Sequence, residues 1–541
     1  MTWRYYFLLT VLGLAVATLV AAFQPAPGYM DADYYYAGGF QLATGHGFTE
    51  PYLWNYLDDP GGLPHPSNAY WMPLASLLAA AGAVLFGPGS WLAARIGFLA
   101  VAAAIPPLTA ALAWSFTPRR DLALTAGLLA VFSAFYLPFL PTTDTFGLYM
   151  VFGGLFFLIV NRQYPSGTLS SIVNFLLLGV ISGLMHLSRP DGLLWLLMAL
   201  IAVFLLCKPG QSPSTTHYSL LTILYSLLSV FAGYLLVMGP WFVRNIFVFG
   251  APLAPGGSKM LWLTSYDHLF SYPASRLTFA SWWQSGLLAI LKARVWSLGL
   301  NLANTLSVQG EVFLLPLIGI GLWRFRKDRR AQLAGLAWLL TLAAMTIAFP
   351  FAGARGGFFH SGAALQPVWW ALAPLGLERV FEWGKQKRSW NVAQAGKVFR
   401  SALIGLAIIL TAVIVWGRVM GGKGGQALRP SSGQAWGQEN AAYSQIYRYL
   451  VSQGVTAEDV IMVANPPGFY LASGNPAIAV PEGDVNTLVT VARRYNVLYL
   501  ILEDGSVPAS LLPVYENPMG QTDLIYLGKV ENARIFLVRH L

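Results

Sequence analysis

Two aspartates near the start of the chain are the residues whose type and spacing best suit chemistry. Asp31 and Asp33 stand two positions apart in the run Asp31-Ala32-Asp33-Tyr34-Tyr35-Tyr36, shortly after an apolar segment. Two carboxylates this close in sequence can accept a proton as a general base, hold a divalent cation, or do both. The same pattern is also typical of an acidic helix start, because the helix dipole favours Asp there. The spacing alone leaves both interpretations open.

Further ionisable residues stand at the ends of apolar segments on the same predicted side of a membrane. Asp144 follows Pro141-Thr142-Thr143, where it is a third candidate acid or an ordinary helix N-cap. Fixed cations stabilise a departing phosphate in a partly dehydrated pocket. The candidates for that role are Arg189, Arg244, Lys259, Arg355, His360 and His65. An ion pair with Asp191 is an equally good explanation for Arg189, and Arg244 has the position of a snorkelling interfacial arginine.

Aromatic side chains beside the acidic motif are candidates to contact a sugar acceptor, and they are Tyr34, Tyr35, Trp54 and Tyr70. Anchoring at a membrane interface is the alternative role for such residues. The sequence demands no cofactor. A divalent cation such as Mg²⁺, Mn²⁺ or Ca²⁺ is the one that Asp31 and Asp33 suit, because these hard cations prefer carboxylate oxygens.

These side chains must be positioned by membrane helices. The chain is 56% hydrophobic and only 10% charged, and its mean hydropathy is +0.56. Soluble domains carry roughly 25% charged residues, so a soluble globular enzyme is excluded. Runs without any Asp, Glu, Lys or Arg cover 163–188, 209–243, 331–354 and 356–377. Such runs are helices, because the strands of membrane barrels alternate in polarity.

The distribution of charge predicts the topology. No Lys or Arg occurs from Tyr5 to Ala94, while the loop 23–90 carries several acids. Cytoplasmic loops collect Lys and Arg, so this loop is extracytoplasmic and the N-terminus is inside. The net charge of +10 then reflects cytoplasmic loops rather than nucleic-acid binding. We expect a multi-pass protein of the plasma membrane, the bacterial inner membrane.

We expect about eleven membrane-spanning helices, near 5–22, 91–115, 121–140, 145–161, 172–187, 191–206, 218–240, 304–323, 332–351, 362–378 and 400–420. The apolar segment 72–87 is short and opens with Pro73, and a crossing there would invert every later charged loop. We therefore expect it to lie in the interface or to re-enter. The Trp-rich, basic segment 276–300 is typical of an interfacial helix.

The composition changes after residue 420. A Gly-rich linker at 421–436 leads into 437–541, where periodicity predicts a small soluble α/β domain outside the membrane. Helices are expected at 437–453 and 484–495, and strands at 460–463, 477–480, 497–502, 524–527 and 533–538. No nucleotide loop, paired-His spacing or nucleophile elbow occurs in this part of the sequence, so its expected role is to cover or shape a site built elsewhere.

The motifs together resemble those of the GT-C superfamily of polytopic glycosyltransferases. They are the Asp31-x-Asp33-Tyr-Tyr loop opening, Gly45-His46-Gly47-Phe48, Met72-Pro73-Leu74, Ser188-Arg189-Pro190-Asp191-Gly192 and Pro240-Trp241-x-x-Arg244-Asn245. Residues 1–420 are most similar to the bacterial branch near the protein O-mannosyltransferases and aminoarabinose transferases. The resemblance implies a polyprenyl-phosphate sugar donor and a lipid, glycan or protein acceptor, with no nucleic-acid partner.

The resemblance also implies roles for the acids. Asp31 would be the general base, Asp33 the second acid or metal ligand, and Asp144 the acid of the second loop, in a displacement that inverts the anomeric carbon. Relatives often have adjacent acids, whereas Ala32 stands between them here, so the choice between Asp31 and Asp33 stays open. Many relatives have a Lys before a Pro-Pro-Leu element, which this chain lacks, so a donor-phosphate contact must come from the cations named above.

Two other classes of protein compete with an enzyme as interpretations. A transporter or flippase of lipid-linked sugars needs ionisable groups near the bilayer midplane, and the predicted helix centres are almost bare of them. A non-catalytic membrane assembly subunit is not distinguished from an enzyme by sequence.

Overall fold

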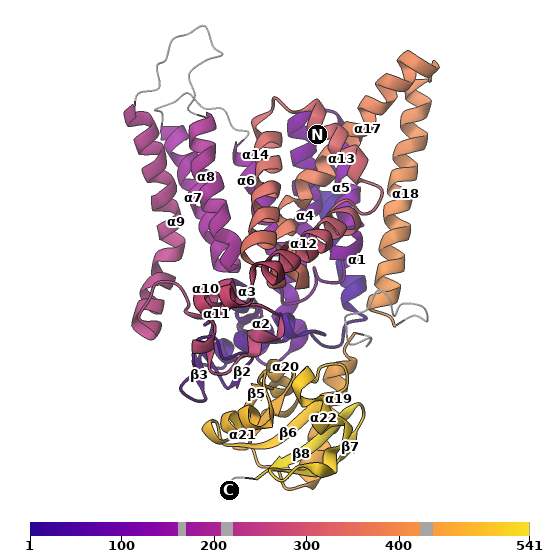
Figure 1. Ribbon diagram of the computed structural model, residues 1–541. Coiled ribbons are helices and arrows are strands. Elements are labelled where there is room, and N and C mark those ends of the chain that lie inside the picture. The colour runs from indigo at the N-terminus through magenta and orange to yellow at the C-terminus, as the bar shows by residue number, and fades with distance from the viewer. Residues whose placement is uncertain (161–168, 207–219, 422–435, 540–541) are drawn as a thin grey trace. The chain divides into compact units, whose positions relative to one another are not determined.

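Long apolar helices dominate the computed structural model, which describes residues 1–160, 169–206, 220–421 and 436–539 (Figure 1). Within these ranges six helices are long and apolar enough to cross a membrane. They are α1 (Trp3–Ala21), α4 (Trp91–Phe116), α7 (Leu169–Ser188), α9 (Leu220–Phe249), α14 (Arg329–Ala343) with the π-helical turn that follows it, and α18 (Val392–Arg418). The helical membrane body is confirmed, while the number of about eleven spans and their orientation stay predictions.

Shorter apolar helices account for several of the other predicted spans. They are α3 (Leu74–Phe86), α6 (Phe146–Val160), α8 (Leu193–Leu206) and α13 (Leu315–Arg324). Helix α3 has 13 residues. At 1.5 Å per residue it is about 20 Å long, against about 30 Å for the hydrocarbon core. Helix α3 is therefore shorter than the hydrocarbon core, and that 72–87 does not span the membrane stays a prediction.

Two predicted spans are interrupted. The segment 121–140 is helical as α5 only over Arg120–Val131, and a short 3-10 turn follows at Ala134–Tyr136. Ala134 has a φ of +41°, a conformation that a helix cannot continue through. The segment 304–323 contains a π-helical turn at Thr305–Gln309 and then a break before α13.

The predicted interfacial segment 276–300 forms two helices rather than one. Helix α11 covers Phe279–Gln284 and α12 covers Leu287–Asn304. They are separated at Gly286, whose φ of +89° suits glycine. The side chains of Trp283, Leu287 and Leu288 are exposed in the structure, which is what an interfacial helix requires.

The chain divides into two compact units that do not follow chain order. Unit 1 consists of Met1–Ala21, Phe98–Pro252 and Arg294–Val415, and unit 2 of Ala22–Gly97, Leu253–Ala293 and Trp416–Leu541. The acidic first loop and the C-terminal region thus belong to one unit. Most of the predicted linker 421–436 lies outside the described residues, and the domain boundaries at 420 and 437 stay predictions.

A mixed six-stranded sheet forms the core of unit 2, in the order β2-β5-β4-β6-β8-β7. The strands are β2 (Tyr52–Leu53), β4 (Val460–Val463), β5 (Ala477–Ala479), β6 (Val497–Glu503), β7 (Leu524–Val530) and β8 (Ala533–Val538). Five of them follow the predicted pattern. The sixth, β2, comes from the first loop and pairs in parallel with β5, Tyr52 opposite Ala477.

Helices accompany this sheet (Figure 1): α19 (Gln438–Ser452), α20 (Pro466–Ser473), α21 (Val485–Arg494) and the short α22 (Leu512–Glu516). Helix α21 buries Leu488, Val491 and Ala492 in a cluster with Leu500 and Phe536 of the sheet. The apolar spacing of the helix therefore decides which of its faces lies on the strands.

The first loop is built around α2 (Met30–Ala43), which contacts α3 and α20. Beyond it, β1 (Thr49–Glu50) pairs antiparallel with β3 (His65–Pro66). In this register Glu50 lies opposite His65. The backbone of the loop thus brings an acid and a histidine together.

Close helix packing characterises unit 1. Helices α7, α8 and α9 contact one another and lie side by side in Figure 1. A Cβ at Gly179 of α7 would lie 2.0 Å from the Val230 carbonyl oxygen of α9, so glycine permits this approach, as small residues do between membrane helices. Short helical turns cover Pro350–Leu365 before α17 (Gln366–Arg388) begins.

Candidate functional site

The two aspartates of the acidic motif lie in the first turn of α2. The helix starts at Met30, so the acidic helix start is observed. At 3.6 residues per turn, positions two apart point about 200° from each other. Asp33 is 1% exposed, whereas Asp31 is half-buried. The helix therefore sends the two carboxylates to different surroundings.

Asp33 faces the C-terminal part of unit 2. Its two oxygens accept hydrogen bonds from Nδ2 of Asn440 at 3.2 Å and Nδ2 of Asn465 at 2.9 Å. The Asn465 amide also donates to Glu439 Oε1 at 2.7 Å, and its Oδ1 accepts from the Gly468 backbone N–H that opens α20. A single side chain thereby joins two carboxylates and caps a helix.

A third buried acid extends this network. The Tyr443 hydroxyl lies 3.2 Å from Glu439 Oε1 and 3.0 Å from Glu503 Oε1. A hydroxyl has one proton, so the Tyr443 hydroxyl donates to only one of these two carboxylates. The other carboxyl group must carry a proton of its own if it is to donate back to the hydroxyl oxygen. Burial raises the pKa of Glu503 to about 8, with the charge of Glu439 adding to the effect. Burial and Glu439 also raise the pKa of Asp33 to about 8.

His65 lies between two acids of the first loop. Its Nε2 is 3.0 Å from Asp58 Oδ2 and its Nδ1 is 3.7 Å from Glu50 Oε1. Burial alone would lower the pKa of His65, but the hydrogen bonds and charges of Asp58 and Glu50 raise it to about 9. The imidazolium is therefore matched by carboxylates of its own loop.

The stability of unit 2 should fall as pH rises from 6 to 9. The His65 ion pairs contribute fully below the ordinary His pKa of 6.5 and are lost as pH passes about 9. Burial raises the pKa values of Asp33 and Glu503 to about 8. The folded state therefore holds these two protons more tightly than the unfolded state, and this contribution to the stability of unit 2 is lost by the time the pH has passed 8. Melting of the purified protein at pH 6, 7.5 and 9 measures the effect.

His65→Gln should make the melting temperature less dependent on pH between pH 6.5 and 9. Glu503→Gln should do the same at pH values up to 8. Glu516→Gln, at an exposed side chain of the same unit, is the matched control and should leave the profile unchanged. A melting temperature that rises from pH 6 to 9 would contradict the assignment.

Unit 1 holds an acid and a histidine that contact each other, Asp144 and His360. Asp144 is buried, accepts hydrogen bonds from the backbone N–H and hydroxyl of Thr145, and has Oδ2 3.3 Å from His360 Nε2. His360 Nδ1 lies 3.0 Å from the Gly356 carbonyl oxygen, and a carbonyl only accepts, so Nδ1 carries a proton. The ring stacks on Phe146 with centroids 3.9 Å apart. These contacts hold the His360 ring so that its Nε2 faces the Asp144 carboxylate.

Arg189 and Asp191 form the ion pair that the sequence offers as an alternative to ligand contact. Arg189 Nε donates to Asp191 Oδ1 at 2.9 Å. Asp191 Oδ2 also accepts from the Ser361 hydroxyl at 2.7 Å and the Tyr149 hydroxyl at 3.3 Å. The turn between α7 and α8 is thereby tied to the residue that follows His360.

The other predicted phosphate ligands lie in different surroundings. Arg244 donates to Asn245 Oδ1 at 3.1 Å, and its guanidinium lies 4.8 Å from the Trp241 ring centroid. Lys259 Nζ is 3.5 Å from the Leu277 carbonyl oxygen. Arg355 is exposed in the glycine-rich turn Gly353–Gly357. Arg244 and Arg355 belong to unit 1 and Lys259 to unit 2.

The predicted aromatic contacts differ in accessibility. The side chains of Tyr34 and Tyr35 are buried, and both pack against Trp71. Trp54 is stacked on Trp71 with centroids 4.1 Å apart. Tyr70 is half-buried and lies edge-on to Trp54. Tyr70 therefore offers the most accessible ring of the four predicted residues.

Sequence reasoning missed the residues that hold Asp33. Asn465-Pro466-Pro467 has the signature of a helix N-cap followed by proline, and it does open α20. The partner is 432 positions away in the chain, which no local pattern reveals.

Comparison with solved structures finds membrane glycosyltransferases. ArnT from Cupriavidus metallidurans bound to undecaprenyl phosphate aligns at a TM-score of 0.52 and 14% identity, over 99% of this chain and 98% of its own. The oligosaccharyltransferase AglB from Archaeoglobus fulgidus, in complex with an inhibitory peptide and a dolichol-phosphate, aligns at 0.52 and 13%, over 93% and 70%. A second structure of the Archaeoglobus fulgidus enzyme, with Zn and sulfate, aligns at 0.50 and 14%, over 91% and 68%.

At these identities the likeness shows the fold, and it confirms the predicted GT-C fold. No known family's sequence profile matches the chain, and no curated protein matches it by sequence.

Proposed function

We propose that this chain, which has the fold of the GT-C membrane glycosyltransferases, transfers a sugar from a polyprenyl-phosphate donor to an acceptor hydroxyl at the extracytoplasmic face of the plasma membrane. The observation that carries the proposal is the likeness to ArnT bound to undecaprenyl phosphate, over 99% of this chain and 98% of that one. A fold shared from end to end includes the first loop and the C-terminal region. The acids at the starts of its helices supply chemistry that this fold can use.

Asp31 is the proposed general base. It is half-buried, while Asp33 is enclosed and engaged by two asparagine amides. A carboxylate is a weak base for an alcohol, so proton removal accompanies attack on the anomeric carbon. The new C–O bond forms as the bond to the phosphate oxygen breaks, the configuration inverts, and the polyprenyl phosphate leaves with the electron pair.

Asp144 and His360 are proposed to hold a divalent cation. The residues fit that role, because His360 Nδ1 donates to the Gly356 carbonyl and leaves Nε2 as the ligand atom, 3.3 Å from Asp144 Oδ2. A backbone carbonyl on the far nitrogen is the usual support of a metal-binding histidine. A cation bound there would supply positive charge for a phosphate.

Binding of a cation should depend on this pair. Asp144→Asn and His360→Gln should each weaken binding of Mn²⁺ or Zn²⁺ by at least about 10–100-fold, the loss usual when only a residue that supports a metal ligand is changed. Asp121→Asn is the matched control, because that acid already pairs with Arg119. Calorimetric titration of the purified protein checks the effect, and unchanged affinity in both variants would remove the pair from this role.

Arg244 and Arg355 are proposed to bind the leaving phosphate. Arg355 is exposed. The guanidinium of Arg244 donates to the Asn245 side-chain oxygen and lies near the rings of Trp241 and Phe249. Arg189 and His65 face carboxylates, which offset their charge. Lys259 contacts a backbone carbonyl and stays a lesser candidate.

The proposal is tested by transfer from labelled polyprenyl-phosphate sugars to candidate lipid, glycan and protein acceptors in proteoliposomes. The expected result is a labelled acceptor together with release of polyprenyl phosphate. Movement of the donor across the bilayer without any labelled acceptor would support a flippase in place of a transferase. Heat-treated protein in the same vesicles is the control.

A further inference from the structure

A buried acid that the proposed chemistry does not use lies in unit 1, where the predicted span 304–323 is interrupted. Glu311 is 1% exposed and follows the π-helical turn Thr305–Gln309 at the end of α12. Glu311 and Val312 have φ values of +43° and +64°, a conformation that is rare outside glycine and strained for a β-branched side chain. Strained backbone and π-helical turns both occur often at functional sites, and a buried ionisable group in a membrane helix is a candidate site as well.

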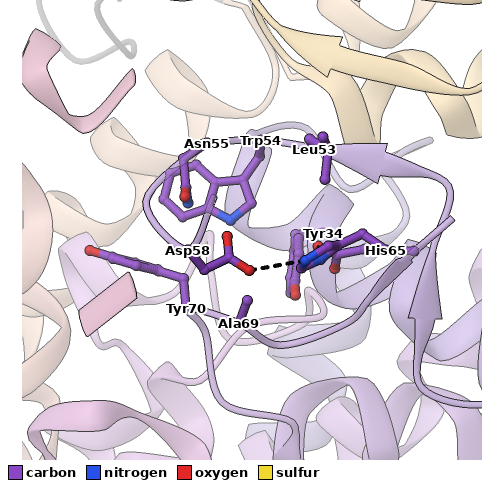
Figure 2. Close-up of a pocket in the computed structure, with 9 residues that line it drawn as sticks. Tyr34, Leu53, Trp54, Asn55, Asp58, His65, Ala69 and Tyr70 are labelled. Carbon is purple, nitrogen blue, oxygen red and sulfur yellow. Dashed lines mark ion pairs between the residues drawn. The ribbon is translucent and has the colours of Figure 1, made fainter. Parts of the chain in front are cut away.

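The carboxyl group of Glu311 has no cationic partner among the described residues. Asp58 of unit 2, whose side chain is also largely buried, lies 3.0 Å from His65 (Figure 2). For Glu311, the group that hydrogen-bonds to Oε1 is the uncharged indole of Trp370, with Nε1 at 2.6 Å. The other oxygen, Oε2, is buried and has no hydrogen-bond partner within the described ranges. A buried carboxylate in this state is unfavourable unless a positive charge joins it.

Two glutamine side chains bring further oxygens to the same stretch of backbone. Gln309 is 1% exposed and Gln366 is fully buried, and the Oε1 atoms of both have no hydrogen-bond partner in the part of the chain that the structure describes. Gln366 Nε2 donates to the Gln309 backbone carbonyl at 3.1 Å. Gln366 and Trp370 are one turn apart on α17, so one face of that helix contacts both Gln309 and Glu311.

The balance of these groups selects a cation. Three buried oxygens are unsatisfied against one donor group, Gln309 Nε2, and the C-terminal end of α12 adds the negative end of a helix dipole. Carboxylate and amide oxygens are ligands of hard cations, and transporters bind sodium where a helix is broken in this way. A single carboxylate balances one positive charge, whereas a divalent ion would leave a net charge buried. We infer that Gln309, Glu311 and Gln366 bind an alkali cation, sodium or potassium.

The cation stabilises the turn that carries His360. A Cβ at Gly362 would lie 2.3 Å from Gln309 Nε2, so the Gln309 side chain packs against the backbone two positions after His360. Binding should therefore slow hydrogen exchange in 305–312 and 358–366. The expected factor is about tenfold at about ten times the dissociation constant of the ion, because opening of this region would release the ion.

Binding of radioactive sodium, or of rubidium as an analogue of potassium, to the full-length protein in lipid nanodiscs tests the inference. The buffer contains choline chloride as its salt and a chelator that removes divalent ions. The unchanged protein should bind labelled ion saturably, and unlabelled sodium or potassium should displace it where choline does not. Glu311→Gln keeps the shape of the side chain and removes its charge, so affinity should fall at least about tenfold.

Melting temperatures separate lost binding from misfolding. Glu311→Gln removes a buried charge, so in choline it should melt no lower than the unchanged protein, and alkali salt should stabilise the unchanged protein alone. Gln309→Leu removes an oxygen ligand and keeps the charge, so it should weaken binding too and serves as the second variant if Glu311→Gln does not fold. Glu378→Gln is the matched control on α17, because that acid already pairs with Arg119 and Arg400, and it should bind like the unchanged protein.

The outcomes decide between a cation and other ways of satisfying these oxygens. Asp144→Asn should keep alkali binding, which separates this site from the divalent cation proposed at Asp144 and His360. Absence of saturable alkali binding, or equal binding by Glu311→Gln, Gln309→Leu and the unchanged protein, would overturn the inference. Equal melting temperatures in choline, sodium and potassium would overturn it as well, and would indicate a bound proton or ordered water in place of the ion.

Discussion

Asp31→Asn should lower the rate of sugar transfer by about 10²–10⁴-fold, the usual contribution of a positioned general base. The asparagine amide has nearly the same shape as the carboxylate but cannot take the proton from the hydroxyl of the sugar acceptor. Asp31 is half-buried in the first turn of α2, so the exchange should leave the fold intact. Initial rates with a labelled polyprenyl-phosphate donor, together with melting temperatures, measure both effects.

Asp33→Asn is the matched control, two positions along the same helix. The amide introduced by this exchange keeps an oxygen for the side chain of Asn465, which donates at 2.9 Å in the unchanged chain. The exchange also removes a carboxyl whose pKa burial raises to about 8. Transfer should therefore stay within about threefold, because no proton-transfer role is removed. Loss of transfer in Asp33→Asn with activity kept in Asp31→Asn would exchange the two roles.

The membrane body was predictable because its signal is local. A run of apolar residues between charges marks each long helix. Helices α9 and α18 cover most of the predicted spans 218–240 and 400–420, although α9 continues to Phe249 and α18 already starts at Val392. The interruptions were not predictable. The strained φ at Ala134 and the π-helical turn at Thr305–Gln309 depend on packing between helices, which hydropathy does not record.

The C-terminal fold shows the same limit. Short, mostly apolar runs predicted β4 and β8 to the residue. The strand β2 has two residues, too few for any periodicity, and its partner β5 lies more than 400 positions along the chain. Pairing across such a distance is decided by tertiary contacts.

For the candidate site, residue types could be selected from sequence, but their partners could not. Asp31 and Asp33 look equivalent in sequence, and only the helix that carries them sends them to different surroundings. Arg189 and Asp191 are the exception, because the short turn that carries both limits where their side chains can lie. The ion pair between them is one of the two explanations that the sequence suggests for Arg189.

Asn465→Leu should destabilise unit 2 by about 2–4 kcal/mol. Leucine cannot cap α20, a loss worth about 0.5–2 kcal/mol, and it leaves the buried oxygens of Asp33 and Glu439 without the donor that now joins them, at about 1–3 kcal/mol more. Hydrogen exchange of the amides of β4 and α20 in the intact protein reports the opening free energy of this region. Asn486→Leu, at an exposed position of α21, is the matched control and should change that energy by less than about 0.5 kcal/mol.

The double variant Asp33→Leu with Asn465→Leu decides whether the network or the helix cap carries the effect. If the loss arises from a carboxylate left buried without its donor, removing Asp33 as well should recover about 1–2 kcal/mol, because replacing both partners by apolar groups costs less than orphaning one. If only the cap matters, the two losses should add, since Asp33 takes no part in capping α20. Strict additivity would therefore contradict the buried network, and recovery would show that α2 and the C-terminal region are held together through these polar groups.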